Sequence, residues 1–180
     1  MAITRLGGAN AISGTIPQGN IANASLGAVT ALPAAIPTGK VLNVVSSSVT
    51  TSIIESTSTT PVEISSSMRV TITPASTSSK FLIQFFATVK TTAGENMAYA
   101  IYKSVGGAGY AKNNAGSSTE AFRQRNSNHN QVSTTMQCFD APNTASEVIY
   151  TPYFWCPSTG TVMINDNGMG SFLLVTEYSS

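Results

Sequence analysis

From residue 41 onward, the hydrophobic residues fall into short runs in which hydrophobic and polar positions alternate. The clearest run is Met68–Thr73, where Met68, Val70 and Ile72 would share one face of a strand. Turn-forming residues separate such runs, as Pro74–Ser79 does after this one. The pattern predicts strands over residues 41–45, 49–54, 61–64, 68–73, 80–89, 97–103, 120–125, 131–139, 147–155, 161–164 and 172–176.

Two of these runs carry further information. Residues 80–89 are nearly all apolar, which predicts a central strand covered on both faces. Residues 147–155 alternate, with Tyr150 and Phe154 on one face and Tyr153 and Trp155 on the other. We expect this strand to form a hairpin with residues 131–139 across the turn-rich segment 140–146.

About ten short strands without a helical pattern predict an antiparallel sandwich of two sheets. The jelly-roll and immunoglobulin arrangements both fit this spacing. We predict an all-β fold, a jelly-roll-like body over residues 41–180 that follows a separate N-terminal segment.

Residues 1–40 have a different character. Their only charges are Arg5 and Lys40, and three prolines and six glycines argue against a helix. A flexible linker is one interpretation, but its isolated aliphatic residues and few charges favour an extended arm that buries them on a partner. The residues expected to anchor this arm are Ile3, Leu6, Ile12, Ile16, Ile21, Leu26, Leu32 and Ile36.

Composition narrows the range of functions. Charged residues make up 9% of the 180, and the net charge is +1, which removes the electrostatic basis for binding nucleic acid. A net charge near zero favours association, so the chain suits an assembly. We expect no membrane insertion, because no apolar run has the length of a membrane span, and no secretory signal at the start of the chain.

Residues suited to catalysis are sparse. His129 is the single histidine, and the eight carboxylates are scattered, so neither a catalytic triad nor a metal site is indicated. Gly106–Gly109 lacks the lysine of a phosphate-binding loop and predicts a tight turn instead. We therefore predict no enzyme, no metal and no cofactor. A glycan-degrading enzyme is a remote alternative.

The two cysteines are predicted to be reduced. In the hairpin expected above, Cys138 would face Val148 and Cys156 would face Asn130. At about 3.3 Å per residue, this register separates the two sulfurs by more than about 20 Å. Free thiols would be consistent with assembly in a reducing cytoplasm.

The aromatic residues divide into two groups. Phe81, Phe85, Phe86, Phe154 and Phe172 lie in apolar runs and are expected in the core. Tyr153 and Trp155 share the other face of their strand, which we interpret as a subunit interface. A platform for stacking a sugar is the alternative, for which the candidate contacts are Tyr110, Arg123, Arg125 and His129.

Three segments resemble a domain found in fibre and virion proteins of tailed phages, especially cyanophages. They are Val70–Ile83, with Thr-Pro, a Ser-rich turn, Lys and an apolar strand; Phe139–Tyr150, with an Asp-x-Pro turn; and Phe172–Glu177, a hydrophobic strand with a near-terminal Glu. The start Ile3–Ile12 and the Ile-Pro-x-Gly units also resemble the arm that precedes this domain. The polar stretch 111–130 and Trp155–Pro157 depart from the family pattern.

The resemblance implies a body that forms a trimer and an arm that docks on the capsid or tail. We therefore expect a structural component of a virion, a fibre, spike or decoration subunit assembled in the host bacterial cytoplasm. Its partners would be copies of itself and other virion proteins. The alternative is a receptor-binding module for host surface polysaccharide.

Overall fold

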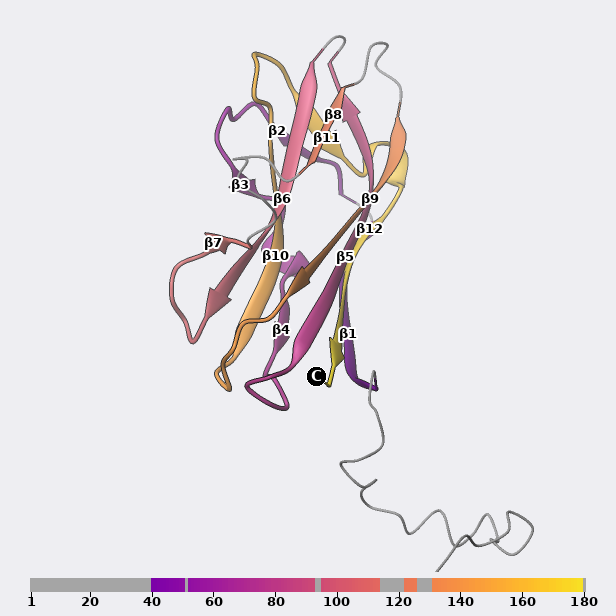
Figure 1. The fold of residues 1–180 in the computed structure, drawn as a ribbon. Coiled ribbons are helices and arrows are strands. Elements are labelled where there is room, and N and C mark those ends of the chain that lie inside the picture. Colours follow the sequence, from indigo (N-terminus) through magenta and orange to yellow (C-terminus); the bar gives the residue numbers. More distant parts are fainter. Residues whose placement is uncertain (1–39, 51, 93–94, 114–121, 126–130, 180) are drawn as a thin grey trace, which may run out of the picture. The chain divides into compact units, whose positions relative to one another are not determined.

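In the computed structural model, which describes residues 40–50, 52–92, 95–113, 122–125 and 131–179, the chain forms β-strands and two short 3₁₀ turns (Figure 1). The 3₁₀ turns are η2 (Ser66–Met68) and η3 (Asp166–Gly168). The strands are β1 (Val41–Val49), β2 (Ile54–Ser56), β3 (Val62–Glu63), β4 (Val70–Ile72), β5 (Lys80–Thr91), β6 (Asn96–Val105), β7 (Ala111–Lys112), β8 (Phe122–Arg125), β9 (Val132–Asp140), β10 (Val148–Trp155), β11 (Val162–Ile164) and β12 (Ser171–Tyr178).

The first layer, which we call the β5 sheet, is built around the long strand β5. On one side β5 pairs with β9, and on the other it pairs with β12 and β11, which follow each other along its length. Strands β1 and β2 then pair with β12 and β11 at the outer edge. All of these pairs are antiparallel.

The second layer, the β10 sheet, has the same plan. Strand β10 pairs with β6 on one side and with β3 and β4 on the other. Strands β7 and β8 then pair with β6 at the outer edge. In the lower half of Figure 1, β7 and β10 of this sheet lie to the left of β5, β12 and β1.

The order of strands identifies the sandwich as a jelly roll. If β1–β2, β3–β4, β7–β8 and β11–β12 each count as one interrupted strand, the described residues form eight. Their order is 1-8-3-6 in the β5 sheet and 2-7-4-5 in the β10 sheet. This order is that of two interlocked Greek keys, so the predicted jelly-roll-like, all-β fold is confirmed and the immunoglobulin alternative is not adopted.

Alternation along the strands fills the space between the sheets. Phe81 and Phe85 of β5 face Tyr150 and Tyr99 of the other layer, with ring centroids 5.8 and 6.5 Å apart. All four residues are at most 4% exposed. Asp140 of β9 accepts hydrogen bonds from Lys103 Nζ and the Tyr150 hydroxyl, which ties the two layers together at one end.

The hairpin expected between residues 131–139 and 147–155 does not form. Strand β9 pairs with β5, whereas β10 pairs with β6 in the other sheet. The segment between β9 and β10 therefore crosses from one layer to the other. Cys138 and Cys156 are both free, as predicted, although the hairpin register from which this was predicted is wrong.

Strand β5 is central, as predicted, but it is not covered on both faces by the described residues. Its outward residues Leu82, Gln84 and Phe86 are only half-buried. Phe172, expected in the core, is 41% exposed and stacks on Phe86 at the surface. These two phenylalanines were misplaced because an apolar run does not reveal which layers lie above it.

The predicted arm, residues 1–40, falls outside the described residues except for Lys40. The Lys40 carbonyl accepts a hydrogen bond from the Ser179 amide at 3.1 Å. Lys40 therefore lies at the same end of the β5 sheet as the C-terminal end of β12.

Candidate functional site

The outer face of the β5 sheet is apolar. Phe86 and Phe172 stack there with ring centroids 4.5 Å apart and planes at 19°. In the neighbouring rows Leu82 and Leu174 are half-buried, while Val44 and Phe139 are 55% and 75% exposed. We call these residues the apolar face: Val44, Leu82, Phe86, Phe139, Phe172 and Leu174.

Register explains why these side chains gather. Leu82 of β5 lies between Phe139 of β9 and Thr176 of β12, and Thr176 lies beside Val44 of β1. Side chains of paired residues point to the same face of a sheet. The polar residues set among them are uncharged: Ser46, Ser48, Gln84, Thr135, Gln137 and Thr176.

The outer face of the β10 sheet carries a different set of side chains, which we call the tyrosine ladder: Tyr102, Tyr153, Tyr110 and Arg69. Tyr102 and Tyr153 stack at 4.0 Å between centroids, and Tyr110 lies 6.3 Å from Tyr153. The Arg69 guanidinium carbon lies 5.1 Å from the centre of the Tyr110 ring. Such stacking holds half-exposed rings in fixed positions.

Glu63 of β3 holds the end of this ladder in place. Both of its oxygens accept hydrogen bonds from Arg69, from Nε and Nη2 at 2.7 Å each, and Oε1 also accepts from the Thr151 hydroxyl at 2.8 Å. The Arg69 hydrogen bonds, with that of Thr151, keep the pKa of Glu63 below its ordinary value despite partial burial. Arg69 is thus fixed in the bidentate geometry that suits its planar fork.

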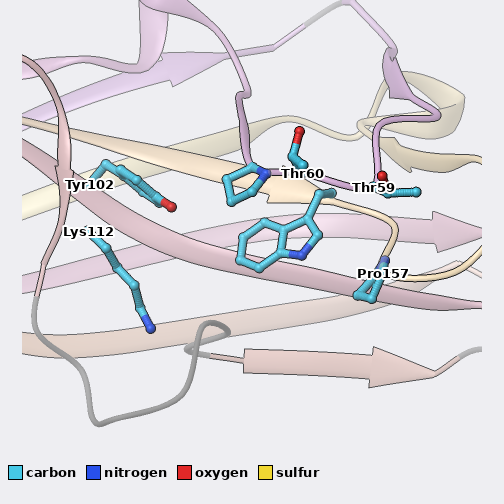
Figure 2. A pocket seen from close by; sticks show the side chains of 7 residues that line it. Thr59, Thr60, Tyr102, Lys112 and Pro157 are labelled. Carbon is cyan, nitrogen blue, oxygen red and sulfur yellow. The ribbon is translucent and has the colours of Figure 1, made fainter.

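Beside the ladder lies a pocket of about 380 Å³, which we call the Trp155 pocket. Figure 2 shows Tyr102 and Lys112 at one end and Thr59 and Pro157 at the other, with Thr60 along its side. Pro61 and Trp155 complete its lining.

Small residues seat the indole of Trp155. Trp155 is paired with Ala98 of β6, and it packs against Ala98, Ala100 and Tyr102. Because the alanine side chains are small, they leave room above the sheet for the large ring. The indole is therefore only 4% exposed, and it still lines the pocket. The β2–β3 connection, with Thr59 and Thr60, closes the pocket from the other side.

The pocket offers hydroxyl groups and apolar ring surface together. Thr59, Thr60 and Tyr102 supply hydroxyls, each both donor and acceptor, and Lys112 supplies an ammonium group. Burial raises the pKa of Tyr102, so its hydroxyl stays neutral at physiological pH. The arrangement can bind a small polar molecule.

The structure brings three of the predicted site residues together. Tyr110, named as a glycan contact, and Tyr153 and Trp155, named as a subunit interface, lie on one face of the β10 sheet. Arg123 is exposed and is paired with Ala98, which in turn is paired with Trp155. Arg125 of β8 is paired with Asn96. His129 and the eight arm residues lie outside the described part of the chain: Ile3, Leu6, Ile12, Ile16, Ile21, Leu26, Leu32 and Ile36.

The sequence pattern did not single out Lys112, Thr59, Thr60 or Pro61 as lining residues. Lys112 belongs to the two-residue strand β7, too short for any periodicity to register. Thr59 and Thr60 resembled an ordinary turn and Pro61 the start of a predicted strand, and all three lie far from Trp155 in the sequence. Only the Trp-Cys-Pro departure at 155–157 was a signal for this region.

Within the described ranges, no three or more histidine, cysteine, aspartate or glutamate side chains are close enough to hold a metal ion. Among the same residues, no helix has the length and apolar character that crossing a membrane requires. A smaller pocket of about 250 Å³ lies at Lys80, Phe139, Asp140 and Ala141, at the edge of the apolar face.

No protein-family model matches this chain, and no curated protein matches it in sequence.

Proposed function

We propose that this chain is a structural subunit of a virion, a fibre, spike or decoration protein, whose jelly-roll bodies associate with one another, as a homotrimer, through the apolar face. The resemblance to phage fibre and virion proteins supports the virion as the setting. In this proposal the subunit acts by association, without catalysis or a cofactor, and residues 1–40 anchor it to other virion proteins.

The observation that carries this proposal is the apolar face itself. Phe139 is 75% exposed, and Phe172 and Val44 are 41% and 55% exposed, on one contiguous side of the β5 sheet. Contiguous exposed apolar residues on a chain mark a surface that associates with another. Since the paired polar residues there are uncharged, a second copy of the same face meets no like-charge repulsion.

The composition of the whole chain agrees with this surface. A net charge of +1 leaves little electrostatic repulsion between copies. An assembly would also explain the apolar composition of β5, because its outward residues Leu82 and Phe86 would then be buried, like its inward residues. Both faces of this strand would then be covered, as its nearly continuous apolar sequence predicts.

The test is the mass of the full chain in solution, measured by light scattering. We expect three times the 18.7 kDa chain mass for the wild type. Phe172→Lys should shift the mass toward that of one chain, while circular dichroism reports an unchanged β-sheet. A matched control is Thr71→Lys, an exposed position on the outer side of the β10 sheet.

A wild-type chain that is monomeric at tens of micromolar would refute association. A Phe172→Lys variant that keeps the full oligomeric mass would place the interface elsewhere and overturn the role of the apolar face.

A further inference from the structure

We infer that the Trp155 pocket binds one pyranose unit of a polysaccharide, and that the tyrosine ladder supports the neighbouring unit. This inference concerns the opposite layer of the sandwich from the apolar face and does not rest on the assembly proposal.

The size and shape of the pocket suit a single sugar ring. Its volume of about 380 Å³ lies near the lower end of the roughly 300–1,000 Å³ found for small-molecule sites. Two prolines, Pro61 and Pro157, form part of the wall, so the shape is held without a large loss of entropy on binding.

The chemistry of the lining points to the same class of ligand. A pyranose presents C–H groups on its faces and hydroxyls around its rim. The Tyr102 ring, the two prolines and the small accessible part of the Trp155 indole offer apolar surface for the former, and the Thr59, Thr60 and Tyr102 hydroxyls offer partners for the latter.

A second sugar unit of the polysaccharide can contact the tyrosine ladder. Tyr102 belongs both to the pocket and to the tyrosine ladder, where it stacks on Tyr153. A chain of sugars that leaves the pocket past Tyr102 therefore meets Tyr153 and Tyr110. The bidentate ion pair between Glu63 and Arg69, which we call the clasp, keeps the far end of the ladder rigid in the absence of a ligand.

The position of the pocket keeps it accessible in an assembly. The outer faces of the two layers of a sandwich point in opposite directions, so association through the apolar face leaves the β10 sheet open. Trp155 lies five residues along β10 from Tyr150, about 16 Å at 3.3 Å per residue. Tyr150 bonds to Asp140 at the end of the body where Lys40 lies, so the pocket lies away from Lys40.

The chain carries its own reporter for the experiment, because Trp155 is the single tryptophan in the sequence. We would titrate the full-length protein with tetrasaccharides of glucose, mannose, galactose, N-acetylglucosamine and galacturonate, and follow tryptophan emission and binding heat. At least one tetrasaccharide should give saturable binding. The isosteric variants Thr60→Val and Tyr102→Phe should each weaken that binding about tenfold, as loss of one hydrogen bond to a ligand does.

Matched controls on the β5 sheet are Thr135→Val and Tyr178→Phe, which should leave the affinity unchanged. The variant Lys112→Gln distinguishes an acidic sugar from a neutral sugar as the ligand. If galacturonate binds most tightly and this variant removes its advantage, the ligand is an acidic sugar. If a neutral tetrasaccharide binds and the variant leaves its affinity unchanged, the ligand is a neutral sugar.

Absence of saturable binding by every tetrasaccharide at millimolar concentration, in both emission and heat, would overturn the inference. Binding that survives both Thr60→Val and Tyr102→Phe in folded protein would overturn it as well, because the site would then lie elsewhere.

Discussion

At the scale of single residues, one buried carboxylate near the end of the chain orders a turn that lies 102 residues earlier. Glu177 of β12 is 1% exposed, and its Oε1 accepts a hydrogen bond from the Ala75 amide at 2.7 Å. The turn 74–79 then delivers the chain into β5. The near-terminal glutamate that formed part of the family resemblance therefore has a structural role within the body.

Replacing this carboxylate should destabilise the fold. Glu177→Ala removes the acceptor of the Ala75 amide from a partly buried hydrogen bond, which costs about 1–3 kcal/mol. Urea denaturation followed by circular dichroism measures the loss. Glu55→Ala, at an exposed position of β2, is the control and should change the free energy of unfolding by less than about 0.5 kcal/mol. Equal effects of the two substitutions would contradict this role.

Cys138 should be unreactive in the folded protein. Burial, the largest influence, raises the pKa of its thiol to about 11, although a hydrogen bond from Asn113 favours the thiolate. Only about a thousandth of the thiol would be ionised at pH 8, and the thiolate is the nucleophile. Alkylation by iodoacetamide, followed by peptide mass spectrometry, should therefore be far slower at Cys138 in native than in urea-unfolded protein. Equal rates in the two states would show the thiol to be open to solvent.

At the scale of elements, the turn between β6 and β7 depends on glycine. Gly106 and Gly107 have φ of +58° and +79°, and the Ala108 amide donates to the Val105 carbonyl across them. Two central residues at positive φ match the right-handed twist of the flanking strands. The predicted tight turn at 106–109 is thus confirmed.

Gly107→Ala should cost about 1–2 kcal/mol through backbone conformation alone, because an added Cβ meets nothing within 4 Å. Gly109→Ala is a matched control in the same connection, since its surroundings are equally open and its φ is not positive. Thermal unfolding compares the two. If Gly109→Ala lowers the melting temperature as much as Gly107→Ala, conformation at position 107 is not the cause.

The clasp between β3 and the residue after η2 should make stability depend on pH. Hydrogen bonds from Arg69 lower the pKa of Glu63 in the folded protein, so the clasp stabilises the fold above the ordinary glutamate pKa of about 4.3. This stabilisation is lost as the pH falls through the lowered pKa. Glu63→Gln should therefore be less stable than wild type at pH 7, and the difference should vanish in strong acid. A difference that is constant from pH 7 to pH 2 would contradict this account.

At the scale of the whole molecule, the two outer faces of the sandwich differ in kind. The β5 sheet presents the apolar face, including Phe139 and Phe172, whereas the β10 sheet presents the tyrosine ladder and the Trp155 pocket. A body with one face for association and another for a ligand suits the display of binding sites on a particle.

The proposed anchoring by residues 1–40 can be tested in the full chain. Ile16→Asp with Ile36→Asp places charges at two aliphatic positions of the segment, which should weaken burial against a virion partner. We expect the double variant to keep its β-sheet spectrum and oligomeric mass but to fall at least tenfold in abundance on purified particles, judged by mass spectrometry. Asn10→Asp with Asn23→Asp adds the same charge at polar positions and should leave abundance unchanged. Normal abundance of the isoleucine variant would refute anchoring by these residues.

Local pattern determined much of the fold. Alternation placed β4, β6, β10 and β12 within a few residues of their observed bounds, and it put Tyr150 and Phe154 inward with Tyr153 and Trp155 outward. These properties follow from the backbone geometry of a strand, in which successive side chains point to opposite faces, so neighbours in the sequence suffice.

The tertiary structure alone decided which strands pair, which apolar faces are left uncovered and which side chains form a pocket. Strands β9 and β10 follow each other in the chain yet belong to different sheets. The Trp155 pocket draws on residues 59–61, 102, 112, 155 and 157, which come together only once both Greek keys have closed. Pairing between distant strands depends on the packing of the whole sandwich, and no local pattern of hydrophobic and polar residues encodes it.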